Sequence, residues 1–306
     1  KKMKIRLTVL LAILVLVCPL ASSSYGSGDC EAGPFNRFIK PMTNPVYFDE
    51  AHNRTYVNVV HALQQLPNNI NTNLGRLPLD GNLNVTATRI NFAVNDRFSL
   101  IAAKAGYVDF DPNNTLNGGN GWLDIGAGLK YAFILDPDNE FVLSGKVLFE
   151  FSNGSRDVYQ GNGDGNAAPQ LTFLKGVDDF QFMGTVGGII PFNHNQESTM
   201  LFTSWHASYA IAEQFFPLIE VNYFRVIRNA NRNELAASVA RWEGGDVINL
   251  GSNNGTSHRN FVTLALGARW RVFKKLDFGF AWETPLTSAQ NGLMLNRYTV
   301  DFVFYF

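Results

Sequence analysis

Hydrophobic and polar residues alternate along much of this chain with a period of two. In the last ten residues, five apolar side chains fall on every second position: Tyr298, Val300, Phe302, Phe304 and Phe306. In an extended strand these side chains project from one face, whereas Thr299 and Asp301 project from the other. The terminal strand therefore has one apolar face and one mixed face.

The same alternation predicts twelve strands, although ten or fourteen would also fit the pattern. The predicted strands span residues 54–63, 82–94, 97–109, 121–135, 141–151, 168–175, 179–191, 198–211, 215–228, 259–273, 276–286 and 297–306. On the fourth of these, the alternation turns the odd-numbered side chains from Leu123 to Phe133 outward. Glycine, asparagine and aspartate are abundant between the strands, as expected of surface turns.

The connections between the predicted strands alternate in length. Five are short, at 95–96, 136–140, 176–178, 212–214 and 274–275, and those between them are longer, at 64–81, 110–120, 152–167, 192–197, 229–258 and 287–295. Antiparallel outer-membrane barrels have short periplasmic turns and longer external loops, whereas a soluble β-sandwich has no reason to sort its loops. We therefore predict an all-β fold, a transmembrane antiparallel β-barrel of about twelve strands over residues 54–306, closed by the C-terminal strand.

The terminal strand also resembles the closing strand and assembly signal of Gram-negative outer-membrane β-barrels. The resemblance rests on its alternating aromatic residues and C-terminal phenylalanine, and it implies an assembly signal formed by Tyr298, Phe302, Phe304 and Phe306. Its implied partners are the barrel-assembly machinery and outer-membrane lipid. Lipid accepts an apolar strand face that nothing else in the chain covers.

The first 24 residues have the pattern of a secretory signal peptide. Four basic residues precede the apolar run Leu7–Val17, and small residues follow it, which predicts cleavage near Ser23 or Ser24 and export through the periplasm. The run is shorter than the roughly 20 residues of a spanning helix, which disfavours an uncleaved anchor. A lipoprotein site at Cys18 is disfavoured by the bulky Val17 before it.

Residues 25–53 form an irregular lead-in, because Pro34, Pro41 and Pro45 discourage both helix and strand. This segment could enter the barrel as a plug. Without residues 1–24 the chain is acidic and retains only Cys30, so we expect no nucleic-acid partner, disulfide or cysteine metal site. The alternating oxygen side chains of 162–166 suggest a calcium loop, but the required glycine and glutamate are missing, so we interpret this stretch as a turn. We expect no cofactor and no metal.

Alternation also assigns the polar side chains of the strands to the barrel interior. The predicted lumen-lining residues are Asp124, Lys130, Lys146, Glu150, His206, Glu220, Asn222, Arg269, Arg271, Asp277, Glu283 and Asp301. A lysine or arginine at mid-bilayer on the outer face would cost about 2–4 kcal/mol, so this sorting is what lipid requires. Since both signs of charge occur, the residues could line a selective aqueous pore or could pair with one another and fill the lumen.

The inward face of strand 198–211 also carries the one arrangement that invites a catalytic interpretation. His206 shares that face with Ser204 and Ser208. Outer-membrane phospholipases, however, resemble one another in placing serine and histidine on the lipid-facing side. No nucleophile elbow, metalloprotease motif or phosphate loop is present. We therefore expect no catalytic residues and no enzyme.

Three segments, at 121–132, 215–222 and 245–251, resemble parts of a group of bacterial outer-membrane proteins. These are the transporters named for a phenol-degradation (MetA) pathway, which are distantly similar to fatty-acid transport barrels. The resemblance implies an outer-membrane channel or passive transporter for small solutes, including small aromatic or apolar molecules. The alternative is a structural or surface-interaction barrel with a closed, salt-bridged lumen and functional loops at 64–81, 152–167 and 229–258. The sequence carries no signal for an oligomeric state.

Overall fold

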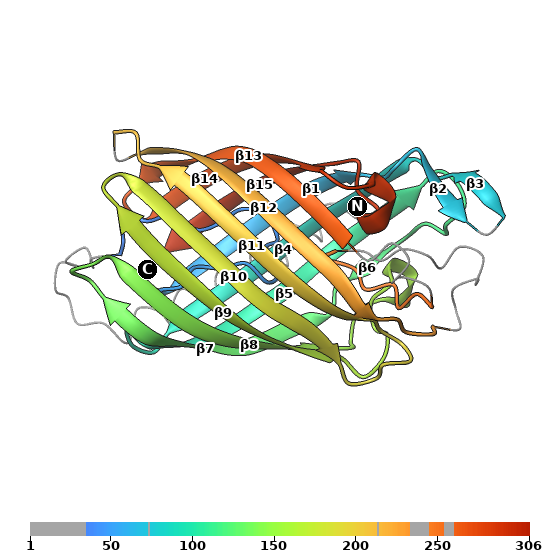
Figure 1. Ribbon diagram of the computed structural model, residues 1–306, viewed down its shortest axis with the longest axis horizontal. Helices are drawn as coiled ribbons and strands as arrows, with labels where there is room; N and C mark the ends of the chain where they lie inside the picture. Colours follow the sequence, from blue (N-terminus) through green and yellow to red (C-terminus); the bar gives the residue numbers. More distant parts are fainter. Residues whose placement is uncertain (1–34, 73, 213, 233–244, 254–259) are drawn as a thin grey trace, which may run out of the picture.

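Twelve antiparallel strands close into a barrel in the computed structural model (Figure 1). The structure describes residues 35–72, 74–212, 214–232, 245–253 and 260–306, so the predicted signal peptide lies outside the described residues. The barrel strands are β1 (Tyr56–Gln65), β4 (Gly81–Ala93), β5 (Phe98–Pro112), β7 (Ile125–Asp136), β8 (Phe141–Phe151), β9 (Asn166–Val177), β10 (Phe180–Pro191), β11 (Thr199–Tyr209), β12 (Phe215–Arg228), β13 (Asn260–Phe273), β14 (Leu276–Pro285) and β15 (Asn296–Tyr305). Each overlaps one of the twelve predicted strands, so the predicted fold class is confirmed.

The first and last barrel strands close the cylinder. β1 pairs with β15 along its whole length, with Tyr56 opposite Tyr305 and Gln65 opposite Asn296. On its other side β1 pairs with β4, and every later barrel strand pairs with the one before it in the barrel. Closure leaves no unpaired strand edge in the barrel, which a lipid environment requires.

The connections sort to the two ends as the sequence predicts. Short turns such as 137–140 and 274–275 lie at the same end as the C-terminus, which is named the turn end here. At the other, loop end, the long connections contain elements that the sequence did not predict: β2 (Asn69–Thr72), β3 (Gly75–Pro78) and the 3-10 helices η1 (Arg156–Val158) and η3 (Ala289–Gly292). The short strand β6 (Gly119–Trp122) overlaps the start of the predicted strand 121–135. Figure 1 shows β2 and β3 extending beyond the barrel at this end.

The outward face of the barrel is apolar. Exposed large side chains recur on every second position, as with Leu129, Tyr131 and Phe133 on β7. None of the helices in the described ranges has the length and apolar character of a membrane span. The glycines of the predicted turn 162–166 have left-handed backbone, with φ of 63° at Gly163 and 87° at Gly165.

The prediction that Leu123 faces outward is wrong. The predicted strand 121–135 is interrupted, because β6 ends at Trp122 and β7 begins at Ile125. The two residues between them, Leu123 and Asp124, both turn inward and are 4% and 2% exposed. Strict alternation holds only within an unbroken strand.

Candidate functional site

The barrel interior contains the lead-in segment, defined here as residues 35–55. This segment enters at the turn end, reaches its innermost point near Val46 and Tyr47, and returns to the turn end, where β1 begins. Of the residues from Phe38 to His52, all but Pro45 are buried. The ring of Tyr47 stacks on Phe202 of β11, with 4.9 Å between ring centroids. The segment forms no regular helix or strand, as its prolines indicate.

Polar side chains of the barrel wall bind the main chain of this segment. Gln181 of β10 accepts from the Ile39 N–H and donates to the Ile39 carbonyl, both at 2.8 Å. Glu220 of β12 accepts from the N–H groups of Met42 and Thr43 at 2.9 and 2.7 Å. An irregular buried segment needs such partners, because its peptide groups have no ladder of their own.

The cationic side chains of the wall do the same with carbonyl groups. Lys130 of β7 donates to the carbonyls of Glu50 and His52 at 3.0 and 2.7 Å. Lys146 of β8 donates to the Tyr47 carbonyl at 3.1 Å. Buried ammonium groups are costly without acceptors, so these carbonyls stabilise both lysines.

The lead-in segment also forms ion pairs. Asp49 lies 2.6 Å from Arg89 of β4 and accepts a hydrogen bond of 2.6 Å from the hydroxyl of Tyr56. Glu50 lies 2.7 Å from Arg54. Arg89 also donates to the carbonyls of Pro45 and Val46 at 2.9 and 3.2 Å. The segment is therefore fixed through main-chain and charged groups as well as through apolar packing.

The structure places all twelve predicted lumen residues inward. Eleven are less than 5% exposed, and the side chain of Arg271 is 16% exposed. The ones that bond to the lead-in segment are Lys130, Lys146, Glu220, Asn222, Arg269 and Arg271. Of the other six, Glu150 bonds to Lys104, Asp124 bonds to the 152–165 loop, and four bond to side chains of the wall: His206, Asp277, Glu283 and Asp301.

Sequence reasoning missed Lys104, whose position depends on a β-bulge. The register between β4 and β5 shifts from Thr88 opposite Ala105 to Ile90 opposite Ala102, so Ala103 and Lys104 both oppose Arg89. Lys104 has a φ of 60° and turns inward, where its ammonium group lies 2.7 Å from Glu150. Strict alternation from the exposed Leu100 would place Lys104 outward, and a charge on a lipid-facing position is the signal that could have found it.

Sequence reasoning also missed Arg89 and Arg297, although their inward positions do not depend on a bulge. Both lie on inward positions, Arg89 on β4 and Arg297 at the start of β15. Arg297 lies 2.9 Å from Glu283 and 2.8 Å from Asp246. Asp246 belongs to the long β12–β13 connection, so this pair could not be derived from strand periodicity.

The pair His206 and Ser208 is within hydrogen-bond reach, as a catalytic interpretation would need. The Nε2 atom of His206 lies 3.0 Å from the Ser208 hydroxyl, and its Nδ1 atom lies 2.7 Å from Glu220. Glu220 simultaneously accepts from Met42 and Thr43 of the lead-in segment. The chain of hydrogen bonds from Ser208 through His206 to Glu220 therefore attaches the lead-in segment to the wall. Ser208 lines neither the cavity of about 40 Å³ nor the cavity of about 20 Å³ in the barrel interior.

Residues 245–252 cover the interior at the loop end and are named the mouth segment. Ile248 and Leu250 are buried in an apolar cluster with Leu66, Leu79 and Phe110. The Val247 carbonyl accepts a hydrogen bond of 3.1 Å from Gln160, and Asn249 bonds to the main chain of Ser198. The interior is therefore bounded by the lead-in segment on one side and by the mouth segment on the other.

The connection between β10 and β11, residues 192–198, contains the buried carboxyl group of Glu197, which lies near that of Glu150. Burial and the neighbouring Glu150 raise the pKa of Glu197, Lys104 and Arg232 lower it, and the net result is a pKa of about 7. Glu197 is 4% exposed. Its side chain is therefore a group of the loop end whose charge changes near neutral pH.

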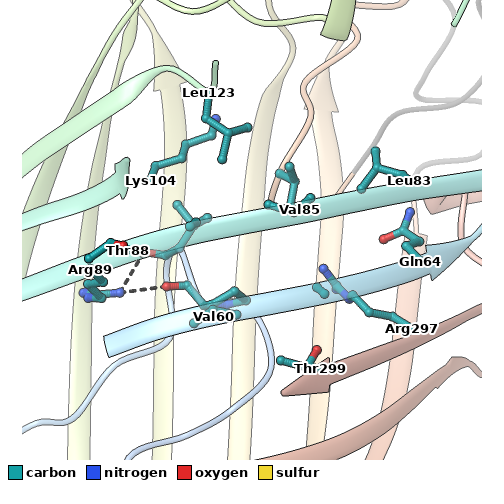
Figure 2. Close-up of a pocket in the computed structure, with 15 residues that line it drawn as sticks. Val60, Gln64, Leu83, Val85, Thr88, Arg89, Lys104, Leu123, Arg297 and Thr299 are labelled. Atoms are coloured by element: carbon teal, nitrogen blue, oxygen red, sulfur yellow. Dashed lines mark hydrogen bonds between the residues drawn. The ribbon is translucent and has the colours of Figure 1, made fainter. Parts of the chain in front are cut away.

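A cavity of about 40 Å³ lies between the two segments (Figure 2). Pro45 and Val46 of the lead-in segment and Val247 of the mouth segment line it, together with inward side chains of β1, β4, β5 and β15. A second cavity, of about 20 Å³, lies toward the mouth and shares Gln64, Leu83 and Val247 with the first. We refer to them as the inner and outer cavities.

Solved outer-membrane barrels have a similar fold. An outer membrane channel from Pseudomonas putida F1 aligns with a TM-score of 0.60 and 11% identity, over 88% of this chain and 100% of that chain. The NanC porin aligns with a TM-score of 0.50 and 8% identity, over 82% of this chain and 100% of that chain. No family model and no curated protein matches the sequence. At these identities the similarity shows the fold, that of outer-membrane barrels.

Proposed function

We propose that this protein is an outer-membrane channel for the passive movement of small solutes, closed in this structure by its lead-in segment. The main support for this proposal is that buried side chains of the barrel wall bind the main chain of the lead-in segment. Lys130, Lys146 and Gln181 use peptide groups of residues 39–52 as their partners. If the wall side chains served only to fill the lumen, we would expect these groups to pair with one another within the wall.

The chemistry of the wall supports an aqueous passage once the segment withdraws. Water can replace the peptide carbonyls that Lys130 and Lys146 bind, because a water oxygen is a hydrogen-bond acceptor just as each carbonyl oxygen is. The wall pairs Arg269–Asp301, Arg271–Asp277 and Lys104–Glu150 would remain, with both signs of charge beside the passing solute. A barrel of this strand number lies between filled eight-stranded barrels and open sixteen-stranded porins.

The solute class that we propose is small aromatic or apolar molecules. The inner cavity supports this class, because most of its lining side chains are aliphatic, including Val60, Leu83, Val85 and Leu123. The resemblance of residues 121–132 and 215–222 to transporters named for a phenol-degradation pathway points to the same class. The similar fold of an outer membrane channel supports a channel role at the coarser level.

The test is single-channel recording with a lead-in segment that can be fixed in place. Tyr47 and Phe202, whose rings stack, are replaced by cysteine in a Cys30→Ser background and joined by a short, reducible thiol cross-linker. We expect channel openings before cross-linking, no conductance once the cross-link has formed, and renewed openings after the cross-linker is cleaved with reductant. Equal conductance with the cross-link in place would contradict the role of the segment. Silence of demonstrably folded protein in every state would contradict a channel.

A second candidate function is a structural or surface-interaction barrel. It is favoured by the small size of the inner and outer cavities, about 40 and 20 Å³, and by the ion pairs that span the wall. Under this proposal the loop-end elements, among them β2 and β3, carry the function. Two results together would favour this function over a channel. The folded barrel would never conduct, and replacement of the 69–78 hairpin would abolish a surface interaction.

A further inference from the structure

The inner cavity has an unequal distribution of charge. Among the residues that the structure describes, three cationic side chains line it, those of Arg89, Lys104 and Arg297, and no carboxylate does. Figure 2 shows these three side chains reaching the cavity from β4, β5 and β15. Their carboxylate partners, the side chains of Asp49, Glu150, Asp246 and Glu283, lie outside the lining.

One of the cations has a free donor. The Nε atom of Arg89 has no hydrogen-bond partner within the described part of the chain, and the side chain is only 4% exposed. Its two terminal nitrogens bond to Asp49 and to the carbonyls of the lead-in tip. A buried guanidinium donor without a partner is costly, so Arg89 adds to the positive charge at the inner end of the cavity.

The lining beyond the inner cavity is mainly apolar. The outer cavity shares Leu83 with the inner cavity and is also lined by Leu66, Phe110, Ile248 and Leu293. The outer cavity also has the carboxylate of Asp246, which bonds to Nη1 of Arg297 at 2.8 and 3.1 Å. The outermost of the three cations is therefore bonded to an acidic residue of the mouth segment, beside an apolar lining.

We propose that the inner cavity binds the carboxylate of a small apolar acid, in exchange for Asp246 at Arg297. This inference rests on the proposed channel and narrows its solute class. The carboxylate would take the place of Asp246 on Arg297, and the apolar body would extend inward along Leu83 and Val85. Arg89 lies deeper, opposite Asn58 of β1, whereas Arg297 lies opposite Gln64, so Arg89 adds positive charge without contacting the carboxylate. Loss of the Asp246 contact would remove one of the bonds that hold the mouth segment to the wall, which couples solute binding to opening at the loop end.

The size of the cavity makes this coupling necessary. A water molecule needs roughly 10–15 Å³ of space measured in this way, so the 40 Å³ of the inner cavity holds only a few waters. An acid as large as benzoate fits only when Val46 or Val247, on opposite sides of the cavity, moves away. Binding therefore favours a state in which one of the two closing segments is displaced.

The test compares benzoate with its uncharged analogue benzamide by titration calorimetry of the full-length protein in detergent at pH 7.5. We expect wild type to bind benzoate about ten-fold more tightly than benzamide, the effect of one good charge-assisted contact of about 1.4 kcal/mol. Asp246→Asn removes the competing carboxylate, so it should bind benzoate several-fold more tightly and leave benzamide binding unchanged. A gain of affinity cannot result from misfolding.

The matched control is Glu140→Gln, which removes a carboxylate of an ion pair with Arg37 at the turn end and should leave both affinities unchanged. Equal binding of benzoate and benzamide by wild type would overturn the carboxylate site. An unchanged benzoate affinity in Asp246→Asn would overturn the exchange at Arg297. Binding in detergent does not require conduction. A conducting barrel that fails to bind benzoate therefore contradicts only this inference, whereas a benzoate-binding barrel that never conducts contradicts the channel.

Discussion

Arg269 of β13 and Asp301 of β15 form an ion pair of 2.9 Å across the strand between them. The residue of β14 that lies in register with both is Gly279, which has no side chain to separate them. Arg269 also donates to the Lys40 carbonyl at 3.1 Å, so the same guanidinium connects the wall and the lead-in segment. This relationship makes Gly279 a determinant of how the lead-in segment is held.

Gly279→Val should therefore weaken the attachment of the lead-in segment. An added Cβ would lie 2.5 Å from Asp301 Oδ1 and 2.6 Å from the end of Met42, and both neighbours are buried. We expect a loss of about 1–3 kcal/mol in the free energy of unfolding, typical of overpacking, together with faster proteolysis within residues 35–52. Limited proteolysis and urea unfolding measure the two effects. Gly188→Ala, where the nearest atom is 3.4 Å away, is the control and should change neither.

Leu266→Arg should impair insertion into the bilayer. Leu266 lies in the middle of β13 on the outer face and is 47% exposed, so an arginine there would meet hydrocarbon at a cost of about 2–4 kcal/mol. Urea titration of folding into vesicles measures the loss. Leu286→Arg, at an exposed site just beyond β14, is the control and should cost much less. Equal losses for the two variants would contradict the assignment of the outer face.

Deletion of Phe306 should slow assembly. Its N–H donates to the Thr55 carbonyl at 3.2 Å at the closing seam, and its exposed side chain continues the outward row of Tyr298 and Phe302. If the assembly machinery recognises this end of β15, the yield of folded barrel in the outer membrane falls several-fold. The comparison variant is Phe273→Ala, which removes another exposed phenylalanine at the turn end. Wild-type assembly kinetics of the deletion variant would exclude Phe306 from the assembly signal.

The pKa of Glu197 predicts a pH dependence of stability. Burial raises this pKa from its ordinary value of 4.5 to about 7, so between these values the folded protein retains a proton that the unfolded chain has lost. Stability should fall as pH rises through this window, by at most about 3 kcal/mol, and should then level off. Urea unfolding at pH 5 and pH 8 measures the fall. Glu197→Gln has no such proton to lose and should show a smaller difference, whereas an unchanged difference would assign the effect to other groups.

The sequence by itself determined the strands and their outer faces. Lipid imposes the same requirement at every second position, so the row Tyr298, Phe302 and Phe306 could be recognised one residue at a time. The same local rule turned Lys130, Glu220 and Arg269 inward, where the structure has them. The lengths of the connections then fixed which loops share an end.

Only the tertiary structure decided what fills the interior. Lys104 is inward because of a bulge, which depends on the register of β4 against β5 and not on the pattern of either strand. Lys146 is bonded to the Tyr47 carbonyl, 99 residues away along the chain. Every residue has a carbonyl group, so such a partner leaves no sign in the sequence. The physical reason is that lipid acts on each side chain separately, whereas the lumen is defined by contacts between residues far apart in the chain.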